Sequence, residues 1–326
     1  MDDTDRKLLM LIAAEPRIHS RKLAQRLVIS RQSVQQRMQV LTKKGVTKGI
    51  TAGISDFYLD AVYVLVFGRS NAALIEEALN RLGESEFTHG AIVAGGNFIY
   101  VRGLLRNISE LDSYAEYVKR AAEMSAPTVG ILRFDAGIMP DYVDGATRRQ
   151  SYKELTPLDL KIIASLKGNV RRPIAEIANR VGASAKTVRR HLEHMISEGS
   201  MDFYVPWDLL PGEDMFTLMH VNLKEGADKG EVGRRLFAKY PFQTLYIRSF
   251  SNLPSFLLCI LCSDRMTEIR KVVRMIGEDE DVLAIMPNLL YIERTYTTWR
   301  DKLPAALTRP SRKARTRALH SEPWTQ

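Results

Sequence analysis

The segment Ser30–Gly45 reads SRQSVQQRMQVLTKKG, and Ser184–Gly199 reads SAKTVRRHLEHMISEG. Each segment begins with a serine, whose hydroxyl can cap a helix, and each ends with a glycine, which favours a helix stop. Between these ends, apolar residues recur at helical spacing and predict one buried face per segment. These residues are Val34, Met38 and Leu41 in the first segment and Val188, Leu192 and Met195 in the second.

The same register extends without a gap over residues 5–45 and 159–199. Asp5 corresponds to Asp159, and the apolar pairs Leu8-Leu9 and Leu23-Ala24 correspond to Ile162-Ile163 and Ile177-Ala178. Agreement over this length indicates duplication of a whole unit. Each copy is predicted to hold three helices, with the capped segment as the third.

Polar side chains occupy the outward face of each third helix. Arginine can donate a forked pair of hydrogen bonds to guanine, and glutamine can pair in the same way with adenine. A helix fits the major groove, with its first turns nearest the bases. The alternative is a solvated polar face, but the caps, the spacing and the duplication favour DNA reading. We predict these DNA-binding residues: Ser30, Arg31, Gln32, Gln35, Gln36, Arg37, Lys43, Lys44, Ser184, Lys186, Thr187, Arg189 and Arg190.

Each helical unit is followed by a β-α-β-β-α-β alternation, the ferredoxin-like order. In the first copy, Ala61–Gly68 is a β-rich run, residues 72–82 form an amphipathic helix with Leu74 inward, and a helix covers residues 108–124. Gly95, Gly96 and Asn97 form a hairpin turn signal. The predicted fold class is α+β, with two winged helix-turn-helix domains alternating with two ferredoxin-like βαββαβ domains.

The expected boundaries follow this order. A winged helix-turn-helix domain covers residues 1–52 and a ferredoxin-like domain covers 53–140, and a linker over 141–155 separates them from the second pair. That pair covers 156–205 and 206–298, and a basic tail over 299–326 is expected to be disordered because it lacks apolar periodicity.

The chain resembles the Lrp/AsnC (feast/famine) family of transcription regulators through Asp5–Leu9, Pro16–Ile18, Leu23-Ala24 and Ser30–Gly45. The resemblance identifies the ferredoxin-like units as RAM domains and implies a small-molecule effector and homo-oligomers through these domains. It places the effector at Gly95, Gly96 and Asn97. The family's aspartate after this turn is absent here, and the second copy keeps neither the glycine nor the aspartate.

Charge is distributed unevenly along the chain, whose formal net charge is +9. Residues 1–50 carry +7 and residues 151–203 carry +3, whereas residues 51–150 carry −4. Two separated basic segments suit an anionic partner that touches only part of the protein. Only two cysteines occur, and three positions apart on a strand they point to opposite faces, so we expect no metal or other cofactor. No membrane span or signal peptide is expected, and a cytoplasmic location follows.

We therefore expect a sequence-specific regulator that binds double-stranded DNA and is not an enzyme. Two alternatives stay open at this point. Sirohaem decarboxylases share the tandem architecture, and His89, Arg102, Arg248 and His220 would be the candidates for such a site. A nonspecific architectural DNA-binding protein is the other alternative, against which the glutamine-rich third helix of the first copy argues.

Overall fold

The computed structural model describes residues 1–15, 18–47, 50–55, 58–133, 154–204, 214–241 and 243–307. Its first head is a three-helix unit made of α1 (Asp3–Ala14), α2 (Ser20–Leu27) and α3 (Arg31–Lys43). The second head repeats this order with α6 (Pro157–Leu166), α7 (Ile174–Val181) and α8 (Ala185–Ser197). Both third helices begin after the predicted serines.

Each head is followed by a sheet that carries two helices on one face. The first contains β2 (Val62–Arg69), α4 (Ile75–Leu82), β3 (Thr88–Ala94), β4 (Phe98–Leu105), α5 (Leu111–Ala121) and β5 (Thr128–Arg133). The second contains β7 (Met215–Leu223), α9 (Lys229–Lys239), β8 (Thr244–Phe250), β9 (Phe256–Ser263), α10 (Met266–Gly277) and β10 (Val282–Thr295). The order is βαββαβ in both, so the predicted α+β fold class is confirmed.

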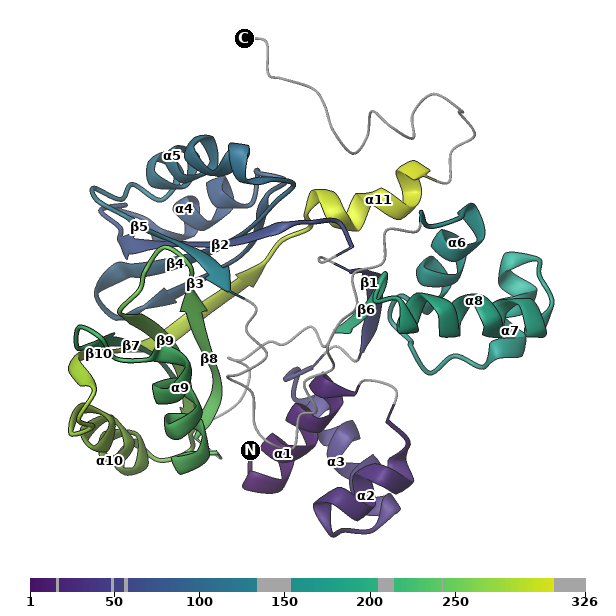
Figure 1. The fold of residues 1–326 in the computed structure, drawn as a ribbon, viewed down its shortest axis with the longest axis horizontal. Helices are drawn as coiled ribbons and strands as arrows, with labels where there is room; N and C mark the ends of the chain where they lie inside the picture. Colours follow the sequence, from purple (N-terminus) through teal and green to yellow (C-terminus); the bar gives the residue numbers. More distant parts are fainter. Residues whose placement is uncertain are drawn as a thin grey trace.

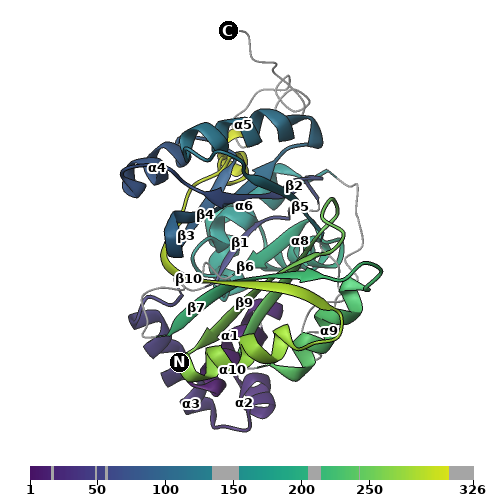
Figure 2. The same cartoon turned by 90° about the vertical axis from the view of Figure 1, so that its left-hand side faces the viewer.

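The two sheets close into one barrel, with the strand order β10-β3-β4-β2-β5-β8-β9-β7. The long strand β10 joins them, because its first part pairs with β7 and its last part with β3. On the other side, Leu132 of β5 lies opposite Phe250 of β8. The sheet helices cover the outside of the barrel (Figures 1 and 2). Apolar cores therefore lie beneath α4 and α5, beneath α9 and α10, and inside the barrel.

A short two-stranded sheet connects the heads. Strand β1 (Thr51–Ile54) pairs antiparallel with β6 (Met201–Tyr204), so that Thr51 lies opposite Tyr204 and Ile54 opposite Met201. An antiparallel pair in this register has a local two-fold axis at its centre. The heads share one apolar core around this sheet, and they lie side by side along one flank of the barrel (Figure 1).

The second head is connected to the first sheet by a helix that the sequence did not predict. Residues 299–307 form α11 (Trp299–Leu307), whereas we expected a disordered tail from residue 299. Trp299 and Leu303 are buried four residues apart, and the Asp301 carboxylate accepts hydrogen bonds from Thr298 at the start of the helix. Buried residues at this spacing dock a helix even in a basic segment. Residues 308–326 lie outside the described chain.

Two further expectations need correction. Leu74 is 60% exposed rather than inward, because it precedes α4 with an extended backbone and helical periodicity does not apply to it. The helix expected from residue 108 begins with a 3₁₀ turn, Ile108–Glu110, and its α-helical part starts at Leu111. Of the linker expected over 141–155, only residues 154 and 155 are described. Pro16 and Arg17, which contribute to the family resemblance, lie outside the described residues.

Candidate nucleic-acid interface

Packing and capping fix the orientation of α3. The Ser30 hydroxyl accepts a hydrogen bond from the Ser33 amide at 3.0 Å, which satisfies one free N–H of the first turn. Val34 and Leu41 are buried at 2% and 1% exposure, so the opposite face of the helix is turned to solvent. The Ser30 hydroxyl is thus engaged in the cap, and its side chain serves primarily to start the helix.

The outward face of α3 carries exposed polar side chains that contact no partner within the described chain. In the described part of the chain, no hydrogen bond or ion pair engages the side chain of any of these residues. They are Arg31, Gln32, Gln35, Gln36, Lys43 and Lys44. An open groove of about 580 Å³ adjoins the start of this face and is lined by Arg21, Gln25 and Arg31, among others. Amide and guanidinium groups left free in this way can contact an external partner.

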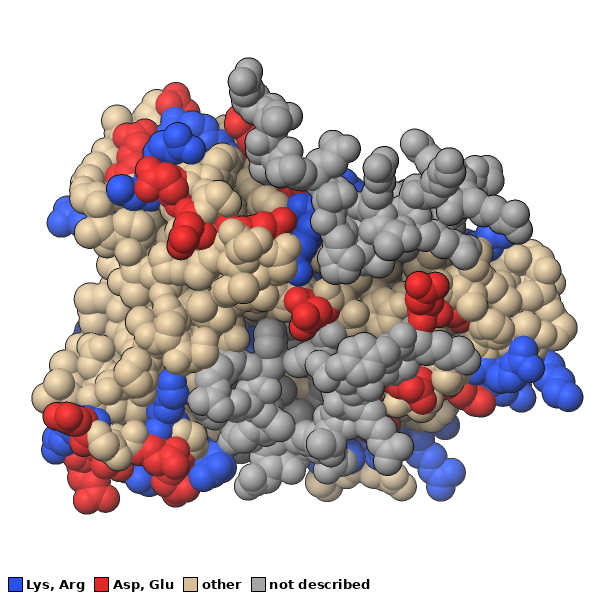
Figure 3. Space-filling model, turned by 45° about the horizontal axis from the view of Figure 1, so that its top comes forward, with Lys and Arg blue, Asp and Glu red and all other residues tan. Residues whose placement is uncertain are grey.

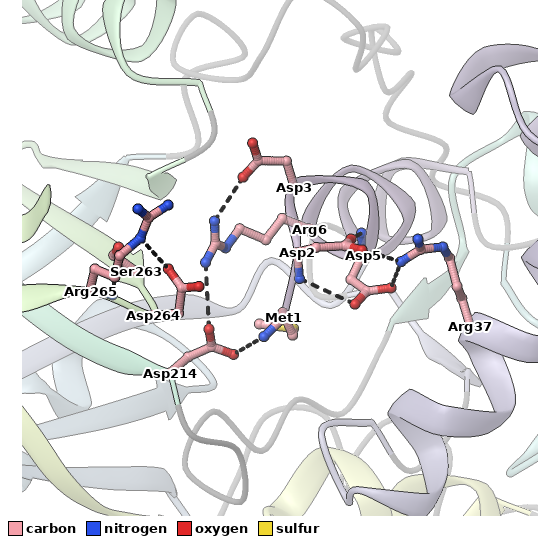
Figure 4. Close-up of polar contacts among 10 residues, drawn as sticks. All are labelled: Met1, Asp2, Asp3, Asp5, Arg6, Arg37, Asp214, Ser263, Asp264 and Arg265. Carbon is pink, nitrogen blue, oxygen red and sulfur yellow. Dashed lines mark hydrogen bonds and ion pairs between the residues drawn. The ribbon is translucent and has the colours of Figure 1, made fainter.

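Arg37 differs from the other predicted residues of α3. Its Nη1 atom lies 2.7 Å from both Asp2 Oδ2 and Asp5 Oδ1, which lie at the start of α1 (Figure 4). Hydrogen bonds from the guanidinium to the Asp5 and Asp2 carboxylates raise the pKa of Arg37 above its ordinary value. The structure therefore places Arg37 as a bridge between α1 and α3, with its charge already neutralised.

The second head carries exposed cations in the first two turns of α8, whereas those of α3 lie at its start and end. Ser184 caps α8 by accepting from the Thr187 amide at 3.1 Å, and the two hydroxyls lie 2.9 Å apart. Lys186, Arg189 and Arg190 are exposed, and no described residue pairs with them. Basic side chains gather at the outer edge of this head, whereas acidic and basic side chains intermingle over the barrel (Figure 3). The cations of α8 are therefore free to meet an anion.

His191 takes the place in α8 that Arg37 has in α3. Its Nδ1 lies 2.7 Å from Asp159 Oδ1 on α6, and Asp159 corresponds to Asp5. Burial opposes ionisation of Asp159, but hydrogen bonds from Thr156 and His191 prevail and lower its pKa. In both heads, a polar bridge therefore connects the third helix to the first. Arg37 and His191 occupy equivalent positions in the two copies, but the sequence did not predict these bridges.

A buried cluster joins α1 of the first head to Asp214, which directly precedes β7 of the second sheet (Figure 4). The Asp214 carboxylate lies 2.8 Å from the Met1 amine and 3.5 Å from Arg6 Nη2, and Arg6 also pairs with Asp3 at 2.9 Å. The Asp214 side chain is only 2% exposed. This cluster fixes α1, and through Arg37 it is connected to α3.

The turn predicted to hold an effector, Gly95, Gly96 and Asn97, is an exposed 3₁₀ turn between β3 and β4. Asn97 Oδ1 accepts a hydrogen bond from the Tyr291 hydroxyl at 3.4 Å. A Cβ built at either glycine would meet no atom within 4 Å. The described residues around this turn therefore form an open surface, and the effector site stays a prediction.

The barrel interior holds polar groups that the sequence did not bring together. The Tyr100 hydroxyl lies 2.7 Å from His220 Nε2 and accepts a hydrogen bond from Asn288 at 2.6 Å. Burial lowers the pKa of His220 to about 4. The rings of Phe67, Phe98 and Phe256 lie 5.3–5.5 Å from the His220 ring. Aromatic packing therefore fills this part of the barrel.

A second group of polar side chains lies on the neighbouring strands β3 and β4 of the first sheet. His89 Nδ1 and Arg102 Nε are buried without a hydrogen-bond partner, although Arg102 Nη2 pairs with Glu293 at 2.9 Å. Burial, together with the nearby charges of Arg102 and Arg300, lowers the pKa of His89 to about 3. Unsatisfied buried polar atoms are uncommon and point to a strained or functional position.

Cys259 and Cys262 lie in different cores on opposite faces of β9, as the strand spacing predicted. Burial raises the pKa of both thiols to about 12, so neither supplies a thiolate at neutral pH. Among the described helices, none is long and apolar enough to cross a bilayer.

Comparison with known proteins supports the description of the heads. A family model described as winged helix-turn-helix DNA-binding matches residues 1–46 and 155–199, which are the two heads. No curated protein matches the chain. Among solved structures, a transcriptional regulator from Neisseria meningitidis, NMB0573 in complex with L-Met, shares 20% identity over 44% of this chain and 96% of its own, with a TM-score of 0.37.

Similarity over the whole length is to an enzyme. The siroheme decarboxylase NirDL covers 94% of this chain and 98% of its own, with 16% identity and a TM-score of 0.58. Its co-complex with an iron-uroporphyrin III analogue gives 15% identity over 94% and 99%, with a TM-score of 0.57. This similarity establishes a common fold. It also contradicts our expectation that the chain is not an enzyme, and a catalytic function is therefore considered below.

Proposed function

We propose that this chain is a transcription regulator that binds duplex DNA through α3 and α8. The observation that carries the proposal is the set of free donors on these two helices. Many arginines elsewhere pair with a nearby carboxylate, as Arg172 and Arg180 do with Glu176. The side chains of Arg31, Lys186, Arg189 and Arg190, by contrast, are exposed and have no partner in the described chain. The winged helix-turn-helix match over both heads supports the same conclusion.

The pairing of β1 with β6 supports use of both heads on one duplex. Because the antiparallel pair has a local two-fold axis, the heads on either side of it can face successive turns of a DNA groove. Binding by one head then presents the other to the same duplex at high effective concentration. The polar bridges at Arg37 and His191 hold each third helix against its own head during this contact.

Double substitution in α8 tests the proposal. Replacing Arg189→Ala and Arg190→Ala removes two phosphate-binding or base-binding groups, and we expect affinity for a selected duplex to fall by about 2–5 kcal/mol. Fluorescence anisotropy with labelled duplex measures the loss. The matched control is Arg234→Ala in α9, whose guanidinium is exposed but paired with Glu231 at 2.7 Å. Equal affinities for the two variants would refute the assignment of α8.

We propose a second candidate, an enzyme that acts on a tetrapyrrole rich in carboxylates. The buried, unpartnered His89 Nδ1 and Arg102 Nε favour it, because an arginine can bind an anionic substrate and a neutral imidazole beside it can accept a proton or a hydrogen bond. The whole-length similarity to siroheme decarboxylase NirDL adds support. The packed rings around His220 would place such a substrate toward His89 rather than in the middle of the barrel.

Titration with iron-uroporphyrin III, followed by its visible spectrum, tests the second candidate. A catalytic site predicts saturable binding, loss of that binding in Arg102→Gln, and release of carbon dioxide from a sirohaem substrate. The Arg235→Gln variant is the control, because this half-buried arginine lies on α9 outside the barrel and pairs with Asp279 at 2.6 Å. An unchanged spectrum at micromolar concentrations would remove this candidate and leave the regulator.

A further inference from the structure

The two heads have the same backbone arrangement but present different chemistry. Both third helices are capped by serine, so residues at equal distances from Ser30 and Ser184 occupy equivalent places. The four outward positions lie two, five, six and nine residues after the cap, and all eight side chains are exposed. In α3 they are Gln32, Gln35, Gln36 and Gln39, and in α8 they are Lys186, Arg189, Arg190 and Glu193.

The ion pairs of Arg37 increase the difference in charge between the outward faces of α3 and α8. Arg37 would add positive charge to the glutamine face of α3, but Asp2 and Asp5 neutralise it at 2.7 Å. The base-reading part of α3 is therefore a stripe of neutral amides, with Arg31 at its start. In α8, by contrast, Lys186, Arg189 and Arg190 keep their full charge, because no described residue pairs with them.

These side chains prefer different bases. Glutamine forms two hydrogen bonds with the N6 and N7 atoms of adenine, whereas arginine and lysine donate to O6 and N7 of guanine. A glutamate accepts a hydrogen bond from N4 of cytosine, the partner of guanine. Cations also contact phosphates, whereas neutral amides release no counterions. One face thus suits A·T pairs, and the other suits G·C pairs and the DNA backbone.

Resting on the proposed function, we infer that the DNA site is composite. The first head reads a half-site rich in A·T pairs through its glutamines. The second head reads a half-site rich in G·C pairs, and its three cations add salt-dependent contacts from the middle of the helix face. The site has no two-fold symmetry in sequence, although the heads are arranged about a local two-fold axis.

Selection of bound duplexes from a random library, followed by sequencing, tests the inference. The wild-type chain should select one A·T-rich and one G·C-rich half-site. A correct pair should be preferred over a wrong one by about 5- to 150-fold at each directly read position. Two half-sites of equal composition would overturn the composite site while leaving the regulator in place. Failure to select any sequence would instead refute sequence-specific binding itself.

Exchange of the outward residues is the sharper test. The variant Lys186→Gln, Arg189→Gln, Arg190→Gln and Glu193→Gln gives the second head the face of the first. Selection should then return two A·T-rich half-sites, and the slope of log affinity against log salt should fall by up to about three. All four residues are exposed, and circular dichroism checks that the variant is folded. An unchanged selected site or salt slope would overturn the inference.

The control for charge is a variant with Arg234→Gln, Arg265→Gln and Arg274→Gln. These three arginines are exposed on the barrel side, and each has a carboxylate neighbour. The control removes three positive charges without touching either third helix. It should keep the wild-type half-sites and most of the salt slope. A loss of slope as large as that of the exchange variant would show that net charge, and not α8, supplies the affinity.

Discussion

Replacing Asp214→Asn tests how the first head is attached to the barrel. The Asp214 side chain is 2% exposed, and the side chains of its partners Met1 and Arg6 are 5% and 6% exposed. Removing one member of a buried ion pair costs roughly 3–5 kcal/mol. Asparagine keeps the volume and one acceptor, and Arg6 retains Asp3 at 2.9 Å, so we expect a loss of about 2–3 kcal/mol.

Urea unfolding followed by circular dichroism measures this loss. The control is Glu231→Gln, which breaks the exposed pair with Arg234 and should leave the free energy of unfolding almost unchanged. If Asp214→Asn were as mild as this control, the cluster would not be an attachment point. A smaller second effect is expected on DNA binding, because α1 also positions Arg37 and α3.

Three further outcomes are expected from the described contacts. Trp299→Ala removes a buried ring and its 2.8 Å hydrogen bond to the Leu104 carbonyl. Thermal unfolding should show a loss of stability of about 3–5 kcal/mol, whereas a loss below about 1 kcal/mol would show that α11 is not docked. Ser184→Ala should cost about 1 kcal/mol through loss of the cap, and Ser184→Gly clearly less, whereas equal losses would argue against capping. The pKa values of His220 and His89, about 4 and about 3, lie below the unfolded value of 6.5, so unfolding takes up protons in acid. The free energy of unfolding should be highest above pH 6.5 and should fall by up to about 1.4 kcal/mol per pH unit for each imidazole between pH 6.5 and 4. Urea unfolding at several pH values measures this fall. An equal dependence on pH in wild type and His220→Asn would contradict the prediction.

Local patterns in the sequence predicted most of the individual elements. Strand β2 (Val62–Arg69) is displaced by one residue from the expected run Ala61–Gly68, and both serine caps form as expected. These features depend on neighbours within a few residues. The βαββαβ order follows from them, because period-two and helical patterns alternate along the chain.

The arrangement of the elements could not be predicted in the same way. The pairing of β10 with both β7 and β3 closes the barrel, and the pairing of β1 with β6 joins the heads. These registers are set between segments far apart in the sequence, and no local period specifies them. Likewise, α11 was missed because, among its side chains over residues 299–303, the buried apolar ones are Trp299 and Leu303, too few to establish a helical period.

The candidate site shows the same limit. Exposure of Gln35 and Arg189 follows from helical periodicity, since Val34 and Val188 face inward. The role of Arg37 does not follow, because its partner carboxylates lie 32 and 35 residues away. Periodicity therefore identifies which side chains face outward, but contacts decide which of them are free to bind.

The most direct test compares two dissociation constants of the wild-type chain at one salt concentration. One is for the duplex recovered by selection, and the other is for random duplex of equal length. A regulator that reads bases with α3 and α8 predicts a ratio of at least about 10³. Equal constants for the two duplexes would contradict sequence-specific reading by the two heads.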